Sequence, residues 1–354
     1  MLKKLLQLVA VTSAIVLGCG MSANVQALAF NQISQVYFFG DSLSDSGFND
    51  LWTVPAPRPA GKAPTFTTFA GYTWSQYIAR DVKGFVLPVY PGPSPADTIT
   101  NNSIYAATGV PGFVSGTLRG IDYAAGGSTT NSTGFVETWA PSLTQQVSFY
   151  LSTHNQQVDP NAVYFIWSGA NDILTLLSGP TLPNQLQLLL TAQMAATNIA
   201  NEVALLSQYG AKRIVVLALP NIGLTPLIGG AAITTNSPTL PAQMKTITFT
   251  FNSMLNTALG KVIHQYGTKV LYVDVYDLLD SVITATQISQ PYTVAGQSFM
   301  FVNYNSPACS TVPTSIYCPS SAPNNYIFAD TLHPTGMAHR VLSLQVEELL
   351  QNWA

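Results

Sequence analysis

Charged residues are scarce in this sequence. Only 8% of its 354 residues are charged, 47% are hydrophobic, and 13 lysines and arginines stand against 16 aspartates and glutamates. The basic residues form no cluster, which argues against a nucleic-acid-binding protein, because phosphates require a positive surface. A surface with so little charge must expose Ser, Thr, Asn and Gln instead, which suits an exported protein. The length and apolar content suffice for one large domain with a sizeable core.

Long hydrophobic runs are absent beyond the N-terminus. The run at Leu5–Leu17 is about half as long as a membrane-spanning helix. It follows Lys3 and Lys4 and precedes small residues that a signal peptidase accepts. We therefore predict a cleaved export signal over residues 1–29 and a secreted or periplasmic mature chain of residues 30–354.

A lipoprotein signal is the alternative for the same segment. Val16-Leu17-Gly18-Cys19 approximates the lipoprotein cleavage motif, although Leu17 is larger than the usual residue there. In this case Cys19 would carry the lipid and anchor the protein in the outer membrane.

Cysteine and histidine are also rare. Besides Cys19, only Cys309 and Cys318 occur, and in an oxidising compartment this close pair is expected to form a disulfide. Two unrelated thiols are the alternative, but buried free cysteines do not suit a stretch rich in Pro and Ser. No two of the four histidines have the spacing of metal ligands, so we expect neither a metal nor another cofactor.

Strand and helix patterns alternate along the chain. Four nearly continuous apolar runs are typical of parallel strands buried on both faces. They are Ile33–Phe39, Ala162–Trp167, Ile214–Leu219 and Val270–Val275, with a shorter fifth candidate at Ile121–Ala124. Apolar residues at helical spacing over 189–206 and 244–262, each followed by a glycine, predict two long helices, and a last helix is expected to begin near Thr335.

This alternation predicts the fold class. Strands joined by helical crossovers form a three-layer α/β/α sandwich with a central parallel sheet, here as a single domain over residues 30–354. Active sites of such sheets lie beyond the carboxyl ends of the strands. Residues 52–118 and 281–326 are rich in Pro, Gly, Thr and Asn, and we interpret both as long functional loops.

Ser42 follows the first predicted strand and is a candidate nucleophile. A serine hydroxyl needs a base to take its proton. His333 can serve, because Asp330 lies three residues earlier and can fix the imidazole tautomer. The alternative is that Asp330 only caps a turn. His154 and His264 are expected at the surface, and His339, six residues after His333, is expected to point to another face as a structural residue.

Four segments together resemble the GDSL or SGNH hydrolase family. They are Gly40-Asp41-Ser42-Leu43, Asp122-Tyr123-Ala124-Ala125-Gly126-Gly127, Gly169-Ala170-Asn171-Asp172 and Asp330-Thr331-Leu332-His333-Pro334, in the family's order over residues 37–340. The resemblance implies a flavodoxin-like α/β/α fold and carboxylic ester hydrolysis. It assigns Ser42, Asp330 and His333 to a catalytic triad, and Ser42, Gly127 and Asn171 to the oxyanion hole.

Some residues depart from the family's pattern. Asp122 stands where the family usually has Asn, so the choice of Gly127 over Gly126 stays open. Asp45 and Asn49 resemble a subgroup pattern, Ser-Asp-x-Gly-Asn, that an extra residue interrupts here. Asp41, next to the nucleophile, is expected to order its loop rather than to react.

The resemblance also suggests the substrate. The first block, the export signal and the cysteine loop are similar to those of secreted bacterial lysophospholipases, phospholipases A and glycerophospholipid–cholesterol acyltransferases. A lipid or other acyl ester is therefore the expected partner, with transient membrane-surface contact and no nucleic acid. The alternatives are a carbohydrate O-acetyl esterase and a non-catalytic exported binding protein on the same fold.

Two hypotheses concern the surroundings of the site. Aromatic residues of the first long loop either line a groove for an acyl chain or belong to the core. These residues are Trp52, Phe66, Phe69, Tyr72, Trp74 and Tyr77. The Cys309–Cys318 loop is expected to shape the entrance. Because His333 must be neutral to act as a base, activity should fall below about pH 6–7.

Overall fold

The computed structural model describes residues 29–46, 65–68, 71–85, 121–132, 140–179, 181–309, 318 and 321–353. Residues 1–28 of the predicted export signal, including Cys19, lie outside these ranges. Asn49, Trp52 and Phe69 lie outside them as well. Among the described residues, no helix combines the length and the apolar character that crossing a bilayer requires.

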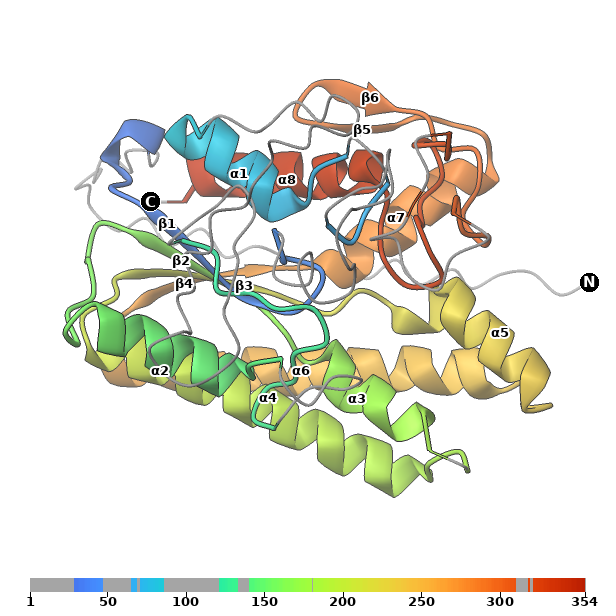
Figure 1. Cartoon of the computed structure of the whole chain (residues 1–354), viewed down its shortest axis with the longest axis horizontal. Helices are drawn as coiled ribbons and strands as arrows, with labels where there is room; N and C mark the ends of the chain where they lie inside the picture. Colours follow the sequence, from blue (N-terminus) through green and yellow to red (C-terminus); the bar gives the residue numbers. More distant parts are fainter. Residues whose placement is uncertain are drawn as a thin grey trace, which may run out of the picture.

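Four parallel strands form the central sheet in the order β1-β2-β3-β4 (Figure 1). They are β1 (Val36–Gly40), β2 (Val163–Trp167), β3 (Arg213–Leu217) and β4 (Lys269–Val273). All four predicted strands are confirmed, with ends shifted by at most three residues. The fifth candidate is reduced to one parallel bridge, in which Asp122 pairs with Phe38 at the outer edge of β1.

Helices cover both faces of the sheet (Figure 1). One face carries α1 (Trp74–Lys83), α7 (Val275–Gln287) and α8 (Gly336–Gln351), and the other carries α2 (Leu143–Thr153), α3 (Ala170–Leu177), α4 (Gln185–Gln208) and α6 (Leu240–Tyr266). The shorter elements are η1 (Phe30–Gln32), η4 (Ile222–Leu224), α5 (Pro226–Thr234), β5 (Tyr292–Val294) and β6 (Gln297–Phe299). The predicted three-layer α/β/α sandwich is confirmed.

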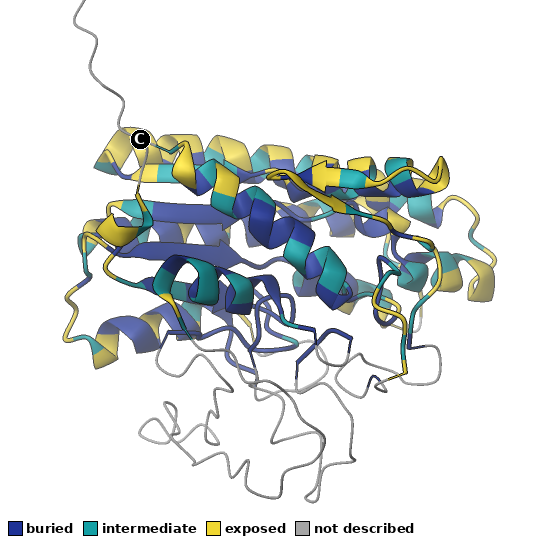
Figure 2. Ribbon diagram, turned by 90° about the horizontal axis from the view of Figure 1, so that it is seen from above, coloured by how far each residue is buried: buried dark blue, intermediate teal, exposed yellow. Residues whose placement is uncertain are grey.

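The strands are apolar on both sides because each side faces a helical layer. In β2, Phe165 and Trp167 pack towards α1, α7 and α8, whereas Tyr164 and Ile166 pack towards the opposite helices. All four side chains are at most 2% exposed. Figure 2 shows the buried strands between helices whose outer faces are exposed. Burial of each such side chain contributes about 1.5–3 kcal/mol.

Local signals set the helix ends that matter for the site. Thr335 caps α8, and its hydroxyl accepts a hydrogen bond from the N–H of Ala338. The helix therefore begins directly after the His333-Pro334 turn, as predicted. At the other end of the fold, Gly267 closes α6 with φ of 64°, a conformation that glycine adopts without strain.

The prediction of an irregular segment over residues 281–326 is wrong for its first part. Helix α7 continues to Gln287, and β5 and β6 form an antiparallel hairpin. The apolar residues of α7 do recur at helical spacing, but the β-branched residues among them lower the helix propensity. The hairpin turn at Ala295-Gly296 has positive φ at both residues, which suits a tight two-residue turn.

The carboxyl end of β1 lies against β2 so closely that only glycine fits. A Cβ atom on Gly40, whose φ is 149°, would lie 2.0 Å from the Trp167 carbonyl oxygen, far closer than van der Waals contact allows. The Gln146 side chain of α2 holds the same residue through two hydrogen bonds of 2.8 Å, to the Gly40 N–H and C=O. The close approach of β2 and these two hydrogen bonds together fix the position of Gly40, the residue before Asp41.

We expect Gly40→Ala to lower the free energy of unfolding by about 3 kcal/mol, because the methyl group must displace the β2 backbone. Gly260→Ala is the matched control, since a Cβ there meets nothing within 4 Å and lies in the interior of α6. That variant should be more stable than the wild type by about 0.5–1 kcal/mol. Urea unfolding measures both, and equal stability of the two variants would contradict the packing argument.

Candidate active site

Three residues from opposite ends of the chain meet at the carboxyl edge of the sheet. The Nε2 atom of His333 lies 2.7 Å from the Ser42 hydroxyl oxygen, and its Nδ1 atom lies 2.7 Å from Asp330 Oδ2. Because an ionised carboxylate only accepts hydrogen bonds, Nδ1 carries the proton and Nε2 presents its lone pair to Ser42. The structure thus brings together all three residues that the resemblance assigns to a triad.

The Asp330 carboxylate is held in its charged form. Burial by itself would raise the pKa of Asp330, but the nearby His333 and hydrogen bonds from its ring and from the backbone outweigh burial and lower that pKa below its ordinary value. The backbone donors are the N–H groups of Leu332 and His333, at 2.7 and 2.6 Å from Oδ1. Asp330 therefore does more than cap a turn.

A tight turn presents Ser42 at the end of β1. The Asp41 carbonyl accepts hydrogen bonds from the N–H groups of Ser44 and Asp45, and its side chain accepts one from Leu43. Asp41 therefore orders the loop, as predicted. Burial raises the pKa of Asp41 to about 7, so its carboxyl carries less negative charge beside Ser42 than an exposed aspartate would.

The two glycines of the second block have different environments. The N–H of Gly126 donates to Asp45 Oδ2 at 2.8 Å. Gly127 has φ of 83°, and its N–H meets no acceptor among the described residues. Asn171 lies in the first turn of α3, and its side-chain amide donates to the Ser128 carbonyl at 2.8 Å, next to Gly127. Only Gly127 of the pair has an N–H group available to a ligand.

The departure at Asp122 has an electrostatic explanation. Its side chain is fully buried, and Oδ1 accepts a hydrogen bond from the N–H of Ala124 at 3.0 Å. Burial raises the pKa of Asp122 well above its ordinary value, with the nearby Asp45 acting in the same direction. A raised pKa favours the protonated, neutral form of the carboxyl, which suits this buried position as the usual asparagine would.

An apolar pocket opens beside Ser42. Its empty space, partly open to solvent, is about 860 Å³. The walls come from the ends of β1 and β2, from the segment after β3, and from α7 and α8. Representative lining residues are Asn171, Ile222, Leu278, Val282, Phe301 and Leu342. Both the pocket and Ser42 lie at the carboxyl edge of the sheet, where the fold class predicts a site.

Those aromatic residues of the first loop that the structure describes do not line this pocket. Trp74 is wholly buried against Phe165. Tyr72 packs edge-on against Tyr77, and the guanidinium of Arg80 lies over the Tyr77 ring. For Trp74 the core interpretation is correct, whereas Tyr72 and Tyr77 are only half-buried. Most of the pocket wall comes from residues late in the chain, since the segments after β3 and β4 and the final helix supply it.

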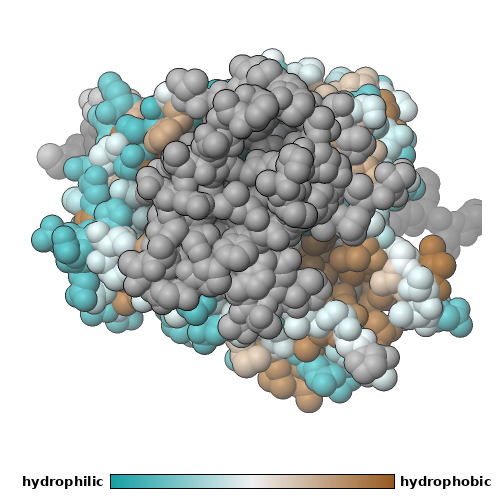
Figure 3. Space-filling view, viewed as in Figure 1, coloured by the Kyte–Doolittle hydropathy of each residue, from teal (hydrophilic) through white to brown (hydrophobic). Residues whose placement is uncertain are grey.

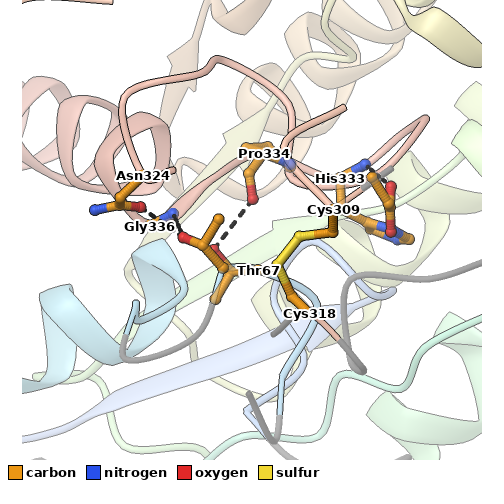
Figure 4. Close-up of a disulfide and its surroundings, with 9 residues drawn as sticks. Thr67, Cys309, Cys318, Asn324, His333, Pro334 and Gly336 are labelled. Atoms are coloured by element: carbon orange, nitrogen blue, oxygen red, sulfur yellow. Dashed lines mark hydrogen bonds and ion pairs between the residues drawn. A yellow bond between two sulfur atoms is a disulfide. The ribbon is translucent and has the colours of Figure 1, made fainter. Parts of the chain in front are cut away.

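Phe66 has a different role that the sequence did not reveal. Its ring centroid lies 4.8 Å from that of His333. The following residues tie this short segment to the turn after His333: the Thr67 hydroxyl donates to the Pro334 carbonyl, and the Gly336 N–H donates to the Thr68 hydroxyl (Figure 4). No sequence pattern marks such a contact, because the partners are separated by more than 260 residues.

The predicted disulfide between Cys309 and Cys318 is confirmed, with a Cα–Cα distance of 5.3 Å. It lies beside the turn that holds His333 (Figure 4). The N–H of Cys309 donates to the Ala329 carbonyl at 2.8 Å, one residue before Asp330. The cross-link therefore braces the segment that carries the acid, while its effect on the entrance stays a prediction.

The remaining histidines do not join the triad. His154 stacks on Tyr150 with a centroid distance of 4.2 Å, and His264 is exposed. The prediction that His339 points to another face is wrong, because its side chain is fully buried and forms part of the pocket wall. The helical spacing was misleading because α8 begins only at Gly336. Burial, with the nearby His333, lowers the pKa of His339 to about 3, so the ring is neutral.

No metal site is evident in the described part of the chain. There, no cluster of three or more His, Cys, Asp and Glu side chains could hold an ion.

Comparison with known proteins supports the family resemblance. The Esterase EstA of Pseudomonas aeruginosa is 29% identical over 333 residues, which cover 90% of this chain and 47% of the esterase. This chain thus spans about half the length of that relative. The GDSL esterase/lipase EXL2 of Arabidopsis thaliana is 25% identical, with 88% of this chain and 87% of the relative covered.

A shorter stretch is similar to Lipase 1 of Photorhabdus luminescens, which is 28% identical over 60% of this chain and 26% of the lipase. The family comparison covers far more, since residues 36–346 match GDSL-like Lipase/Acylhydrolase and this range includes all four blocks. The chain belongs to the GDSL-like lipase/acylhydrolase family.

Proposed function

We propose that this protein is a serine esterase that hydrolyses acyl esters of lipids. The observation that carries the proposal is the continuous hydrogen-bonded chain from Ser42 through His333 to Asp330, with 2.7 Å at each link, at the mouth of an apolar pocket. The relatives named esterase and lipase support the same class of reaction. In this proposal, Ser42 is the nucleophile, His333 the base and Asp330 its partner.

The reaction follows from this geometry. The Ser42 oxygen attacks the ester carbonyl while its proton moves to His333 Nε2, and a tetrahedral oxyanion forms. When this intermediate collapses, the C–O bond to the alcohol breaks and Nε2 returns the proton to the leaving oxygen. Water then attacks the acyl-serine by the same route. Asp330 stays ionised and stabilises the imidazolium in each half-reaction.

Three donors are suited to the oxyanion. The N–H groups of Ser42 and Gly127 meet no acceptor among the described residues, and the Asn171 amide has a second hydrogen besides the one directed at Ser128. Donors already in place stabilise the transition state by about 3–4 kcal/mol each, since no reorganisation is needed. We assign the oxyanion hole to these three residues.

The apolar pocket favours an acyl chain as the substrate's acid part. A lysophospholipid or phospholipid would place its chain against residues such as Leu278 and Val282, with the ester at Ser42. An acceptor alcohol in place of water would make the same acyl-enzyme an acyltransferase. A carbohydrate O-acetyl esterase is less well supported, because an acetyl group would leave this pocket empty. The disulfide and the predicted signal favour an exported enzyme.

We expect the purified wild type to release fatty acid from lysophosphatidylcholine and Ser42→Ala to lose this activity by at least about 10⁴-fold, because the nucleophile is removed. Ser152→Ala, at an exposed serine in α2, is the control and should be fully active. Titration of released fatty acid measures all three. Residual activity of Ser42→Ala near the wild-type level would refute the assignment of the nucleophile.

The depth of the pocket should set the chain-length preference. Val282→Trp fills the pocket from α7, so hydrolysis of a p-nitrophenyl ester of a twelve-carbon acid should fall about tenfold or more, while hydrolysis of the acetate ester is retained. The short ester serves as the internal control for folding. If both esters lose activity equally, or neither does, the acyl chain binds elsewhere.

Acid should inactivate the enzyme through one protonation. Imidazole takes up a proton below about pH 6–7 and can then no longer act as a base. The lowered pKa of Asp330 keeps its carboxylate ionised in this range. The kcat/KM for a soluble ester, measured from pH 4 to 8, should therefore fall with a slope of one proton. Asp330→Asn should lower kcat by about 10³–10⁴-fold. A rate that is constant down to pH 4 would exclude His333 as the base.

A further inference from the structure

Exposed apolar side chains lie on segments that adjoin the pocket wall. Leu224 and Ile233 lie on one side, in η4 and α5, with 38% and 83% exposure. Met300 and Val302 follow β6 and are 47% and 59% exposed. We call these four residues the apolar rim. Figure 3 shows hydrophobic surface at this end of the molecule, where Figure 1 places α5.

The apolar rim is continuous with the pocket wall. Phe301 is 2% exposed and lines the pocket, while Met300 and Val302 on either side of it face outward. On the opposite side, Leu224 lies between two lining residues, Ile222 and Thr225. Each side of the rim is therefore directly joined in sequence to the surface that would bind the acyl chain.

The rim is also fixed to the catalytic turn. The N–H of Leu227 in α5 donates to the Thr331 carbonyl at 2.8 Å, between Asp330 and His333. Helix α5 consists of uncharged residues. Its Ile228 is buried, and Leu227, Ala231 and Ala232 pack against the core, so that Ile233 is the large apolar side chain that the helix exposes.

The charge distribution indicates what the rim meets. Residues 214–244 and 281–329, which supply the rim and part of the pocket wall, contain no charged residue. Charged residues close to these segments include Asp280 of α7, whose carboxylate accepts a hydrogen bond from the Asn221 side chain, and Lys245 of α6, whose backbone lies against Gly223. This surface lacks the basic cluster that binds anionic lipids, and Asp280 would repel them.

We propose that the apolar rim docks the enzyme on zwitterionic lipid surfaces and places the pocket mouth directly above its substrate. The inference rests on the proposed function, since it assumes that the pocket takes an acyl chain. Insertion of the rim among lipid headgroups removes its apolar area from water, which provides the binding energy without ion pairing. The acyl chain then passes from the lipid to the pocket along a continuous apolar path.

The test compares vesicle binding with hydrolysis of a soluble ester. Binding to phosphatidylcholine vesicles is measured by flotation in a Ser42→Ala background, which prevents hydrolysis of the lipid. Ile233→Ser combined with Val302→Ser should weaken binding about tenfold or more. In the active enzyme, the same pair should leave hydrolysis of monomeric p-nitrophenyl butyrate unchanged, because neither residue lines the pocket.

Ile263→Ser is the matched control. Ile263 is 39% exposed, but it lies 18 residues beyond Lys245 in α6, about 27 Å along the helix axis. This variant should bind vesicles as the wild type does. Binding should also survive high salt and should not increase when phosphatidylglycerol is added. An equal loss in Ile263→Ser, or binding that depends on anionic lipid, overturns the proposal.

The outcomes separate the two proposals. A wild type that cleaves the soluble ester but does not bind vesicles refutes the docking role and leaves the esterase intact. Vesicle binding that needs the rim, in a protein that cleaves no ester, supports docking and refutes the proposed function. If the wild type self-associates through the rim and does not bind vesicles, the rim is a subunit interface and the docking proposal fails.

Discussion

The geometry of the site depends on the buried carboxylate of Asp330. It accepts hydrogen bonds from the N–H groups of Leu332 and His333 through one oxygen, and from the His333 ring through the other. The same group therefore shapes the turn and orients the imidazole. Burial of a charge is costly, and here the donors of its own turn provide the compensation.

Several contacts from distant segments keep this turn in place. The backbone N–H of Cys309, which is held by the disulfide, donates to the carbonyl of Ala329, the residue before Asp330. The ring of Phe66 packs against that of His333. Helix α8 starts at Gly336, whose close approach to Gly71 allows no side chain on either residue. Rigid support of this kind holds the base in register with Ser42, since a loose imidazole would lose much of its effect.

The buried acids around the site differ in pKa because burial is offset to different extents. At Asp330, the nearby His333 and the hydrogen bonds from His333 and Leu332 outweigh burial and lower the pKa, whereas at Asp41 and Asp122 burial dominates and raises it. Negative charge is thus retained where it stabilises an imidazolium, and reduced beside Ser42, where an oxyanion would form in the proposed reaction. The substitution of an aspartate for the family's usual asparagine is compatible with the site for this reason.

Much of the fold was predictable from local patterns. Continuous apolar runs marked all four strands because a sheet covered on both faces tolerates no polar residue in its centre. Helix ends at Gly267 and Thr335 followed from backbone conformation and capping. Helices α1 and α7 and the hairpin after α7 contradict the two predicted loops, because a composition rich in Pro, Gly, Thr and Asn does not exclude regular structure where apolar residues recur at helical spacing.

The sequence by itself determined the order of the four blocks, the candidates Ser42, Asp330 and His333, and the pairing of Cys309 with Cys318, because each rests on residue types at short spacing. Only the tertiary structure decided that the Gly126 N–H is engaged by Asp45, that Phe66 packs on His333, and that His339 lies in the pocket wall. It also placed the pocket among late helices rather than early aromatics. These features depend on contacts between segments tens to hundreds of residues apart, and no local pattern encodes which surfaces meet when the layers pack.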